Sequence, residues 1–144
     1  MKNILFVLAV LISTSLFSQE REWGDLEKNE LTLNEIAPIW PGCEKGNANT
    51  RDNCFNKNLS AHIRSHFKYP AKEYKENIQG IVTVDFNINE KGGVDILNVT
   101  GPSKGLKDEA KRIILALPKM KPGMLAGKPR AIKYTVPFNF KTGK

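Results

Sequence analysis

Three stretches of the sequence alternate apolar and polar residues, and this pattern constrains the fold more than any other feature. In residues 81–89 the two faces of the predicted strand are Val82, Val84, Phe86 and Ile88 against Thr83, Asp85, Asn87 and Asn89. Residues 94–100 and 132–140 repeat the alternation. Strands with one apolar and one polar face are typical of an antiparallel sheet that is covered on one side only.

The connections between these strands carry their own signals. Residues 89–93 hold Gly92 and Gly93, which indicates a hairpin between the first two strands. The last strand contains Pro137, which has no backbone N–H to donate, so we expect it at an edge of the sheet. An exposed edge accepts a strand from another chain. The alternative is that Pro137 only ends the pairing of its own strand.

A first helix is predicted from about Asp52, a good N-cap, to the proline at residue 70. Its apolar residues fall four apart on one face: Phe55, Leu59, Ile63 and Phe67. A short helical turn is expected at residues 72–74. A second helix is predicted at residues 106–117, and Pro118 ends it.

The second helix carries one apolar stripe: Leu106, Ala110, Ile113, Ile114 and Leu117. Asp108 and Glu109 are expected in its first turn, where the helix dipole favours negative charge. The order is therefore helix, strand, strand, helix, strand. We predict a two-layer α+β domain in which two helices cover one face of a three-stranded antiparallel sheet.

The first nineteen residues are typical of a signal peptide. Lys2 precedes a nine-residue apolar run, residues 4–12, whereas a membrane-spanning helix needs about 20 apolar residues. We expect cleavage and an exported mature chain with no membrane span; the alternative is an uncleaved N-terminal anchor. The expected organisation is a signal peptide at 1–19, a flexible acidic lead-in at 20–39 and a single domain at 40–144.

Cys43 and Cys54 are the only cysteines. In an exported protein a closely spaced pair indicates a disulfide, and closing a loop of this size stabilises by roughly 3 kcal/mol in the chain-entropy model. The alternatives are a two-thiolate metal site and free thiols. A metal site has little support because His62 and His66 are the only histidines.

The net charge of +7 is unevenly placed: residues 104–144 hold eleven Lys and Arg against Asp108 and Glu109. A basic region can indicate nucleic acid, but the leader argues against that partner. Anionic envelope surfaces or an acidic peptide fit an exported chain better. The simplest interpretation is a solvated lysine-rich surface.

No residues form a recognisable catalytic pattern. His62 and His66 have helical i, i+4 spacing, but Ile63 stands where a metalloprotease needs glutamate, so we expect surface histidines. The serines lie in no nucleophile-elbow pattern, and the glycines form no phosphate loop. We therefore expect a protein that is not an enzyme and has neither metal nor cofactor.

The order of these elements resembles the C-terminal domain of TonB, the energy transducer of the Gram-negative envelope. The residues that carry the resemblance are Tyr69-Pro70, Gln79-Gly80, Pro122-Gly123 and the closing Pro137-Phe138-Asn139-Phe140. The flanking Pro41-Gly42-Cys43-Glu44 and Cys54-Phe55 are similar to the version found in the Bacteroidetes.

The resemblance implies a periplasmic module that binds the TonB box, an extended segment of an outer-membrane TonB-dependent transporter, as a strand added beside its last strand. Carried over, the binding edge is Arg130, Ala131, Ile132, Lys133, Tyr134, Thr135 and Val136. Pairing between two exposed edges also allows a homodimer. The alternative function is an envelope adaptor or structural protein that uses the same fold for other protein or cell-wall partners.

The sequence departs from a complete transducer of this family in two respects. Such a transducer has an uncleaved inner-membrane helix and a long periplasmic spacer, and neither pattern follows the short leader here. We therefore expect a free-standing domain in the periplasm rather than a complete transducer.

Overall fold

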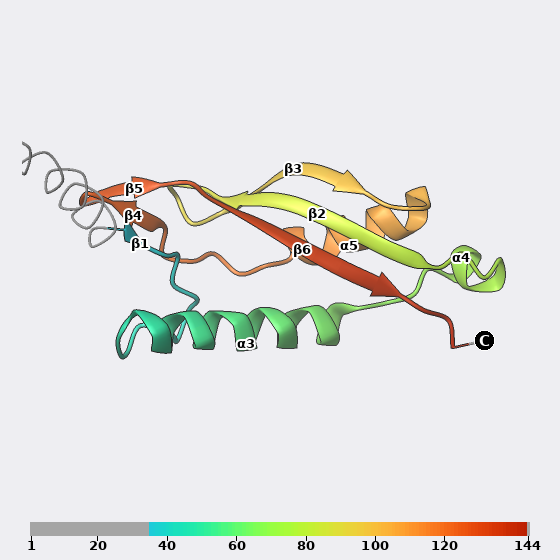
Figure 1. Cartoon of the computed structure of the whole chain (residues 1–144), viewed down its shortest axis with the longest axis horizontal. Coiled ribbons are helices and arrows are strands. Elements are labelled where there is room, and N and C mark those ends of the chain that lie inside the picture. The colour runs from blue at the N-terminus through green and yellow to red at the C-terminus, as the bar shows by residue number, and fades with distance from the viewer. Residues whose placement is uncertain (1–34, 144) are drawn as a thin grey trace, which may run out of the picture. The chain divides into compact units, whose positions relative to one another are not determined.

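The computed structural model of the chain describes residues 35–143. The predicted signal peptide and the lead-in up to residue 34 lie outside the described residues. The elements, drawn in Figure 1, are β1 (Glu35–Ile36), α3 (Ala48–His66), α4 (Ala71–Lys75), β2 (Gly80–Ile88), β3 (Val94–Thr100), α5 (Lys104–Leu115), β4 (Gly123–Leu125), β5 (Lys128–Arg130) and β6 (Ile132–Phe140).

The main sheet is antiparallel and has the strand order β3-β2-β6. β2 and β6 pair over their whole lengths, from Gly80 opposite Phe140 to Ile88 opposite Ile132, with no shift in register. The predicted strands at 94–100 and 132–140 are confirmed at both ends, and β2 begins one residue before the predicted run. β6 lies at an edge of this sheet, as its proline predicted.

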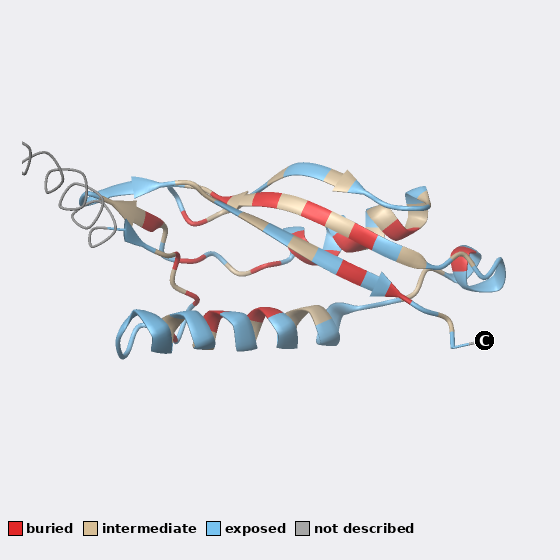
Figure 2. Cartoon of the chain, in the orientation of Figure 1, coloured by how far each residue is buried: buried red, intermediate tan, exposed pale blue. Residues whose placement is uncertain are grey.

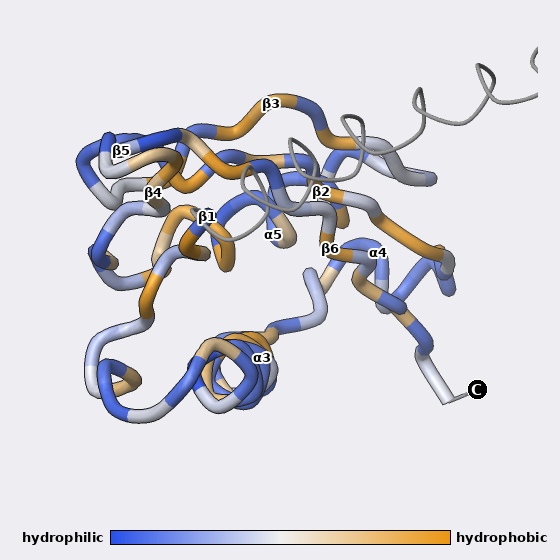
Figure 3. Tube along the Cα trace, turned by 60° about the vertical axis from the view of Figure 1, so that its left-hand side comes forward, coloured by the Kyte–Doolittle hydropathy of each residue, from blue (hydrophilic) through white to orange (hydrophobic). Residues whose placement is uncertain are grey.

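Both long helices cover the apolar face of the main sheet. α5 packs on β2 and β3 and contacts α3, and Figure 3, which looks along α3, shows the apolar side of that helix turned toward the strands. Buried and half-buried residues alternate along β2 (Figure 2). The most deeply buried large side chains are Phe86, Phe140, Ile88, Leu106, Ile113, Ile114, Val82 and Val84. The predicted two-layer α+β fold is confirmed.

α3 begins earlier than the sequence predicted. Its N-cap is Asn47, whose side-chain oxygen accepts a hydrogen bond from the backbone N–H of Thr50 at 2.9 Å, and Asp52 lies inside the helix. The reason is that the apolar stripe starts only at Phe55, so the first turn carries no periodic signal. Phe67 follows the helix and is 37 % exposed.

α5 also begins earlier, after the N-cap Ser103. Asp108 and Glu109 therefore lie in the second turn and not in the first, which corrects the expectation that they complement the helix dipole. Each carboxylate instead pairs with a basic side chain of the same helix, Asp108 with Lys104 and Glu109 with Arg112. The predicted turn at 72–74 is confirmed as part of α4.

A small second sheet, with the order β1-β4-β5, was not predicted. Its strands are two or three residues long, too short for alternation to show. Ala126 and Gly127, both at positive φ, form a two-residue hairpin of the type I′ kind between β4 and β5. β1 lies at Glu35–Ile36, inside the segment expected to be flexible lead-in.

Candidate functional site

The free edge of β6 is the candidate binding site. β6 pairs with β2 on one side, and no strand within residues 35–143 pairs with it on the other. Pro137 lies opposite Thr83 in a ladder without register shift. A proline cannot complete a hydrogen-bonded pair, so its backbone, and that of Lys133, Thr135 and Asn139, points away from β2.

These outward-facing residues also carry the polar side chains of β6. The Thr135 hydroxyl donates to Asp85 Oδ1 on β2 at 2.6 Å, and Lys133 Nζ lies 4.0 Å from Asp85 Oδ2. Both side chains are therefore held on the uncovered face of the sheet. The edge offers N–H groups at residues 133, 135 and 139, with a gap in the donor row at 137.

The inner side of β6 is anchored in the core. The Tyr134 ring stacks between Phe55 of α3, with 5.2 Å between centroids, and Phe86 of β2, at 5.8 Å. Burial, followed by the negative charge of Asp52, raises the pKa of Tyr134 to about 12. Phe138 and Phe140 are buried. A strand anchored in this way holds its backbone ready for a partner without prior rearrangement.

The predicted binding edge spans two different sheets. Ile132 to Val136 lie on β6, but Arg130 belongs to β5, where it pairs with Gly123. Ala131 joins the two strands. Arg130 therefore does not share the free backbone edge of the main sheet, a division that the sequence pattern missed because residues 128–136 look continuous.

Two of the family motifs lie at the C-terminal end of β6. The Tyr69 hydroxyl donates to the carbonyl of Ile78 at 2.6 Å, and its ring meets that of Phe140 edge-on at 5.6 Å. Gln79 Oε1 accepts a hydrogen bond from the backbone N–H of Thr142 at 3.2 Å. Tyr69-Pro70 and Gln79-Gly80 thus hold the place where β6 ends.

The third motif, Pro122-Gly123, lies at the other end of the strand. A Cβ on Gly123 would stand 2.5 Å from Cγ1 of Ile132, the first residue of β6. Such a distance is too short for carbon atoms, so only glycine lets the two segments approach this closely. The motif residues therefore position both ends of the edge strand.

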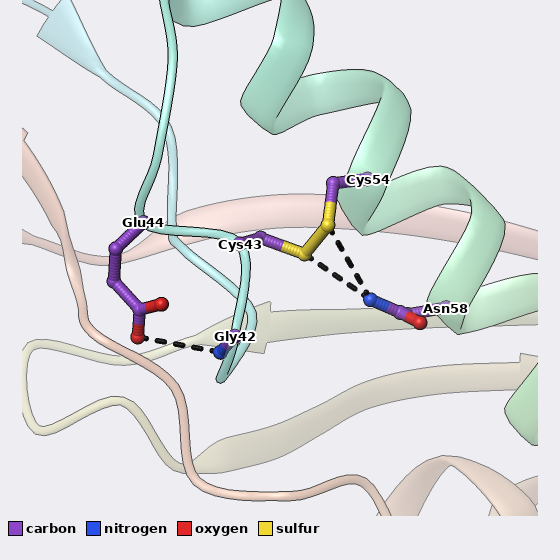
Figure 4. Close-up of a disulfide and its surroundings, with 5 residues drawn as sticks. All are labelled: Gly42, Cys43, Glu44, Cys54 and Asn58. Atoms are coloured by element: carbon purple, nitrogen blue, oxygen red, sulfur yellow. Dashed lines mark hydrogen bonds between the residues drawn. A yellow bond between two sulfur atoms is a disulfide. The ribbon is translucent and has the colours of Figure 1, made fainter.

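Cys43 and Cys54 form the predicted disulfide (Figure 4), with their Cα atoms 5.8 Å apart. Asn58, one turn further along α3, directs its amide nitrogen toward both sulfurs, at 3.1 Å from Cys43 Sγ and 3.6 Å from Cys54 Sγ. The bond fixes the segment after β1 to α3. It also holds Trp40 in the core, edge-on to Phe55.

His62 is half-buried and has a structural contact. Its Nε2 lies 2.9 Å from the carbonyl of Ile113, which makes that nitrogen the donor and joins α3 to α5. This corrects the expectation of a surface side chain; His66, stacked on it at 4.1 Å, is exposed. Within residues 35–143 no three potential metal ligands gather.

A comparison with known protein families identifies the family of this fold. The family model described as the Gram-negative bacterial TonB protein C-terminal domain matches residues 65–142, and a search of curated proteins found no match. The domains of that family are non-enzymatic protein-interaction domains associated with envelope transport. Among the described residues, no helix has the length and apolar character to cross a membrane. The chain belongs to the family of TonB C-terminal domains.

Proposed function

We propose that this protein is a periplasmic module that captures an extended segment of a transporter. The segment, of the TonB box type, belongs to an outer-membrane TonB-dependent transporter and adds as a strand to the free edge of β6. The proposal rests on family membership and on one observation: the outward-facing backbone of Lys133 and Thr135 has no strand partner within the described part of the chain.

The energetics favour a reversible grip. Each ladder hydrogen bond contributes about 0.5–1.5 kcal/mol net, whereas ordering a peptide backbone costs about 1–2 kcal/mol per residue. Backbone pairing alone therefore leaves little net affinity. Contacts with exposed side chains such as Lys133 must supply the remainder, and they give the capture its selectivity.

The test uses substitutions of Thr135, because its N–H points outward. Thr135→Pro removes that donor and leaves the pairing with β2 in place, and it should lower affinity for a synthetic TonB box peptide at least tenfold. Thr135→Val keeps the N–H and loses only the hydroxyl bond to Asp85. This control should bind within about threefold of the parent, since an exposed hydrogen bond contributes little.

Both affinities are measured by isothermal titration calorimetry, and circular dichroism checks that each variant is folded. If a folded Thr135→Pro variant binds the peptide as well as Thr135→Val does, strand addition at β6 is wrong.

The second candidate function is an envelope adaptor for anionic cell-wall or protein partners. The observation that favours it is the exposed basic strand β5, in which Lys128 and Arg130 flank Pro129. Affinity capture from an envelope extract separates the two functions. Recovery of outer-membrane transporters supports peptide capture, and recovery of wall fragments supports the adaptor.

A further inference from the structure

α3 follows β6 along the covered face of the main sheet, in the same direction as the strand (Figure 1). Phe55 stacks on Tyr134 with 5.2 Å between the ring centroids. Phe67, directly after the helix, has its ring centroid 5.0 Å from that of Phe140. Between these two contacts the helix advances about 18 Å and the strand about 20 Å, so the two elements remain side by side. The family match begins at residue 65, so nearly all of α3 precedes it.

The two flanks of α3 face different surroundings. On one flank His62 lies 2.9 Å from a backbone carbonyl of α5, and Asn58 contacts the disulfide. At about 100° per residue, these two side chains project roughly 20° and 60° from Phe55 in one sense, whereas Asp52 and Ile63 project roughly 60° and 80° in the other. Because α5 packs on β2 and β3, the flank opposite to it is on the free side of β6. Asp52 and Ile63 form this outer flank of α3.

The apolar core is open at the free edge of β6. Val84 and Phe86 of β2 are fully buried. Their partners across the ladder, Val136 and Tyr134, point to the same face but are only half-buried. Ile63 of the outer flank is half-buried as well. A strand added to β6 places every second side chain on this face, where it lies next to Tyr134 and Val136 and faces the outer flank.

Asp52 gives the outer flank a negative charge at the end where Tyr134 lies. Its carboxylate is exposed and makes no ion pair within residues 35–143. The charge reaches the phenol of Tyr134, where it adds to burial in raising the pKa. A basic side chain that points inward beside Tyr134 would therefore meet an opposite charge, and an acidic one would be repelled.

We propose that the outer flank of α3 is part of the capture site and selects the inward-facing side chains of the bound segment. The preferred segment has a basic residue beside Asp52 and, two positions along, an apolar residue against Val136 and Ile63. This inference rests on the proposed peptide capture at β6. It adds the chemistry of the captured segment and assigns a role in binding to a helix that precedes the family match.

The test uses two synthetic peptides that differ in one inward-facing residue. They are Ser-Val-Thr-Lys-Thr-Val-Ser and Ser-Val-Thr-Glu-Thr-Val-Ser, both acetylated and amidated. Each reads the same in both directions, so the result does not depend on whether the added strand is parallel or antiparallel. Isothermal titration calorimetry should show that the parent binds the lysine peptide about fivefold more tightly, the upper range for an exposed ion pair.

Asp52→Lys should reverse this preference, because the charge of the outer flank is then positive. Asp108→Lys on α5 is the matched control, since it changes the net charge of the protein by the same amount. The control should keep the preference of the parent, because its helix packs on β2 and β3 and not beside the free edge.

Val136→Thr tests the apolar contact. It keeps the shape of the side chain and the backbone donors of β6, and it should weaken the binding of both peptides about threefold to tenfold. The reason is that a methyl group covered by the peptide is replaced by a hydroxyl. Val94→Thr is the control, because Val94 is a half-buried valine on the opposite edge strand, β3, and it should bind as the parent does. Circular dichroism checks that all variants are folded.

The outcomes separate this inference from the proposed function. If Thr135→Pro abolishes binding but Asp52→Lys leaves the preference unchanged, strand capture stands and the role of α3 is wrong. If neither peptide binds the parent, or if Thr135→Pro binds as the parent does, capture at β6 is wrong and the role of α3 falls with it. Tighter binding by Cys43→Ala/Cys54→Ala also overturns the inference, because α3 then obstructs the edge.

Discussion

The guanidinium group of Arg112 donates a hydrogen bond to the backbone carbonyl of His66 at 2.6 Å and so joins α5 to the last turn of α3. Glu109 holds Arg112 in place by accepting two hydrogen bonds from its guanidinium group, at 2.8 and 2.9 Å, and it accepts a third from the backbone N–H of Lys68, at 2.9 Å. The hydrogen bond from Arg112 is the main reason that the pKa of Glu109 lies below its ordinary value. The pair therefore fixes the end of α3 that leads into the Tyr69-Pro70 motif.

Glu109→Gln should lower the free energy of unfolding at neutral pH. It should also make that free energy depend less on pH in the acidic range. A carboxylate with a lowered folded pKa stabilises the fold above its unfolded pKa, near 4.5, and this contribution is lost as the pH falls through the folded value. We expect a loss of about 1–2 kcal/mol at pH 7, typical of hydrogen bonds to a charged group.

Urea denaturation at pH 7 and pH 3 measures this difference. Asp108→Asn is the matched control, because its ion pair with Lys104 is exposed to solvent and therefore contributes little to stability. A loss for Glu109→Gln that is as large at pH 3 as at pH 7 would contradict the assignment.

Tyr134 should titrate late and weaken the fold in alkali. Burial raises its pKa to about 12, so its contribution is complete below pH 10 and is lost as the pH rises through the folded value. Ultraviolet difference titration should show one phenol near pH 12. Tyr134→Phe keeps the ring stack and should remove that phase, whereas Tyr74→Phe should leave it unchanged.

Ala126 should tolerate replacement by residues that favour positive φ. It has a φ of +50° in the hairpin between β4 and β5, a conformation that costs an L-residue with a Cβ about 1 kcal/mol. Ala126→Asn should therefore raise the free energy of unfolding by about 0.5 kcal/mol, since Asn-Gly is the preferred pair in this turn. Gly127→Ala, the reverse change at φ +75°, should lower it. Thermal denaturation of both variants measures these two changes in stability.

Reduction of the Cys43–Cys54 disulfide should lower the free energy of unfolding by about 2–4 kcal/mol, typical of a closed loop of this kind. The Cys43→Ala/Cys54→Ala variant should show the same loss and no response to reductant. Guanidinium denaturation with and without reductant measures both. If the denaturation midpoint of the parent is unchanged when free-thiol titration shows complete reduction, the disulfide does not stabilise the fold.

The main sheet was predictable because its strands are long enough to repeat the alternation. β6 runs for nine residues with one polar face, and Pro137 indicates its edge position. The small sheet was not predictable, since β1 has two residues and its pairing with β4 joins segments about ninety positions apart. No local pattern encodes such a contact, because it depends on where the rest of the fold places the two segments.

The candidate site, too, could be predicted from the sequence only in part. The free edge follows from one proline, but the sequence gives no sign that Arg130 leaves this edge for another sheet. Helical spacing also does not reveal that His62 of α3 contacts the backbone carbonyl of Ile113 in α5. Side-chain contacts between distant elements depend on helix position to within an ångström, which periodicity does not specify.

Pro137 also sets a limit on the free edge. A sheet grows when each new strand offers the next one a full row of donors and acceptors. Here the row lacks its donor at residue 137, close to the middle of the 133–139 stretch. The donors at Lys133 and Thr135 leave room for the short partner proposed above, but the strand is a poor template for a continuous stack of copies. The same residue that indicates the edge position of β6 thus makes this edge a poor template for fibril growth.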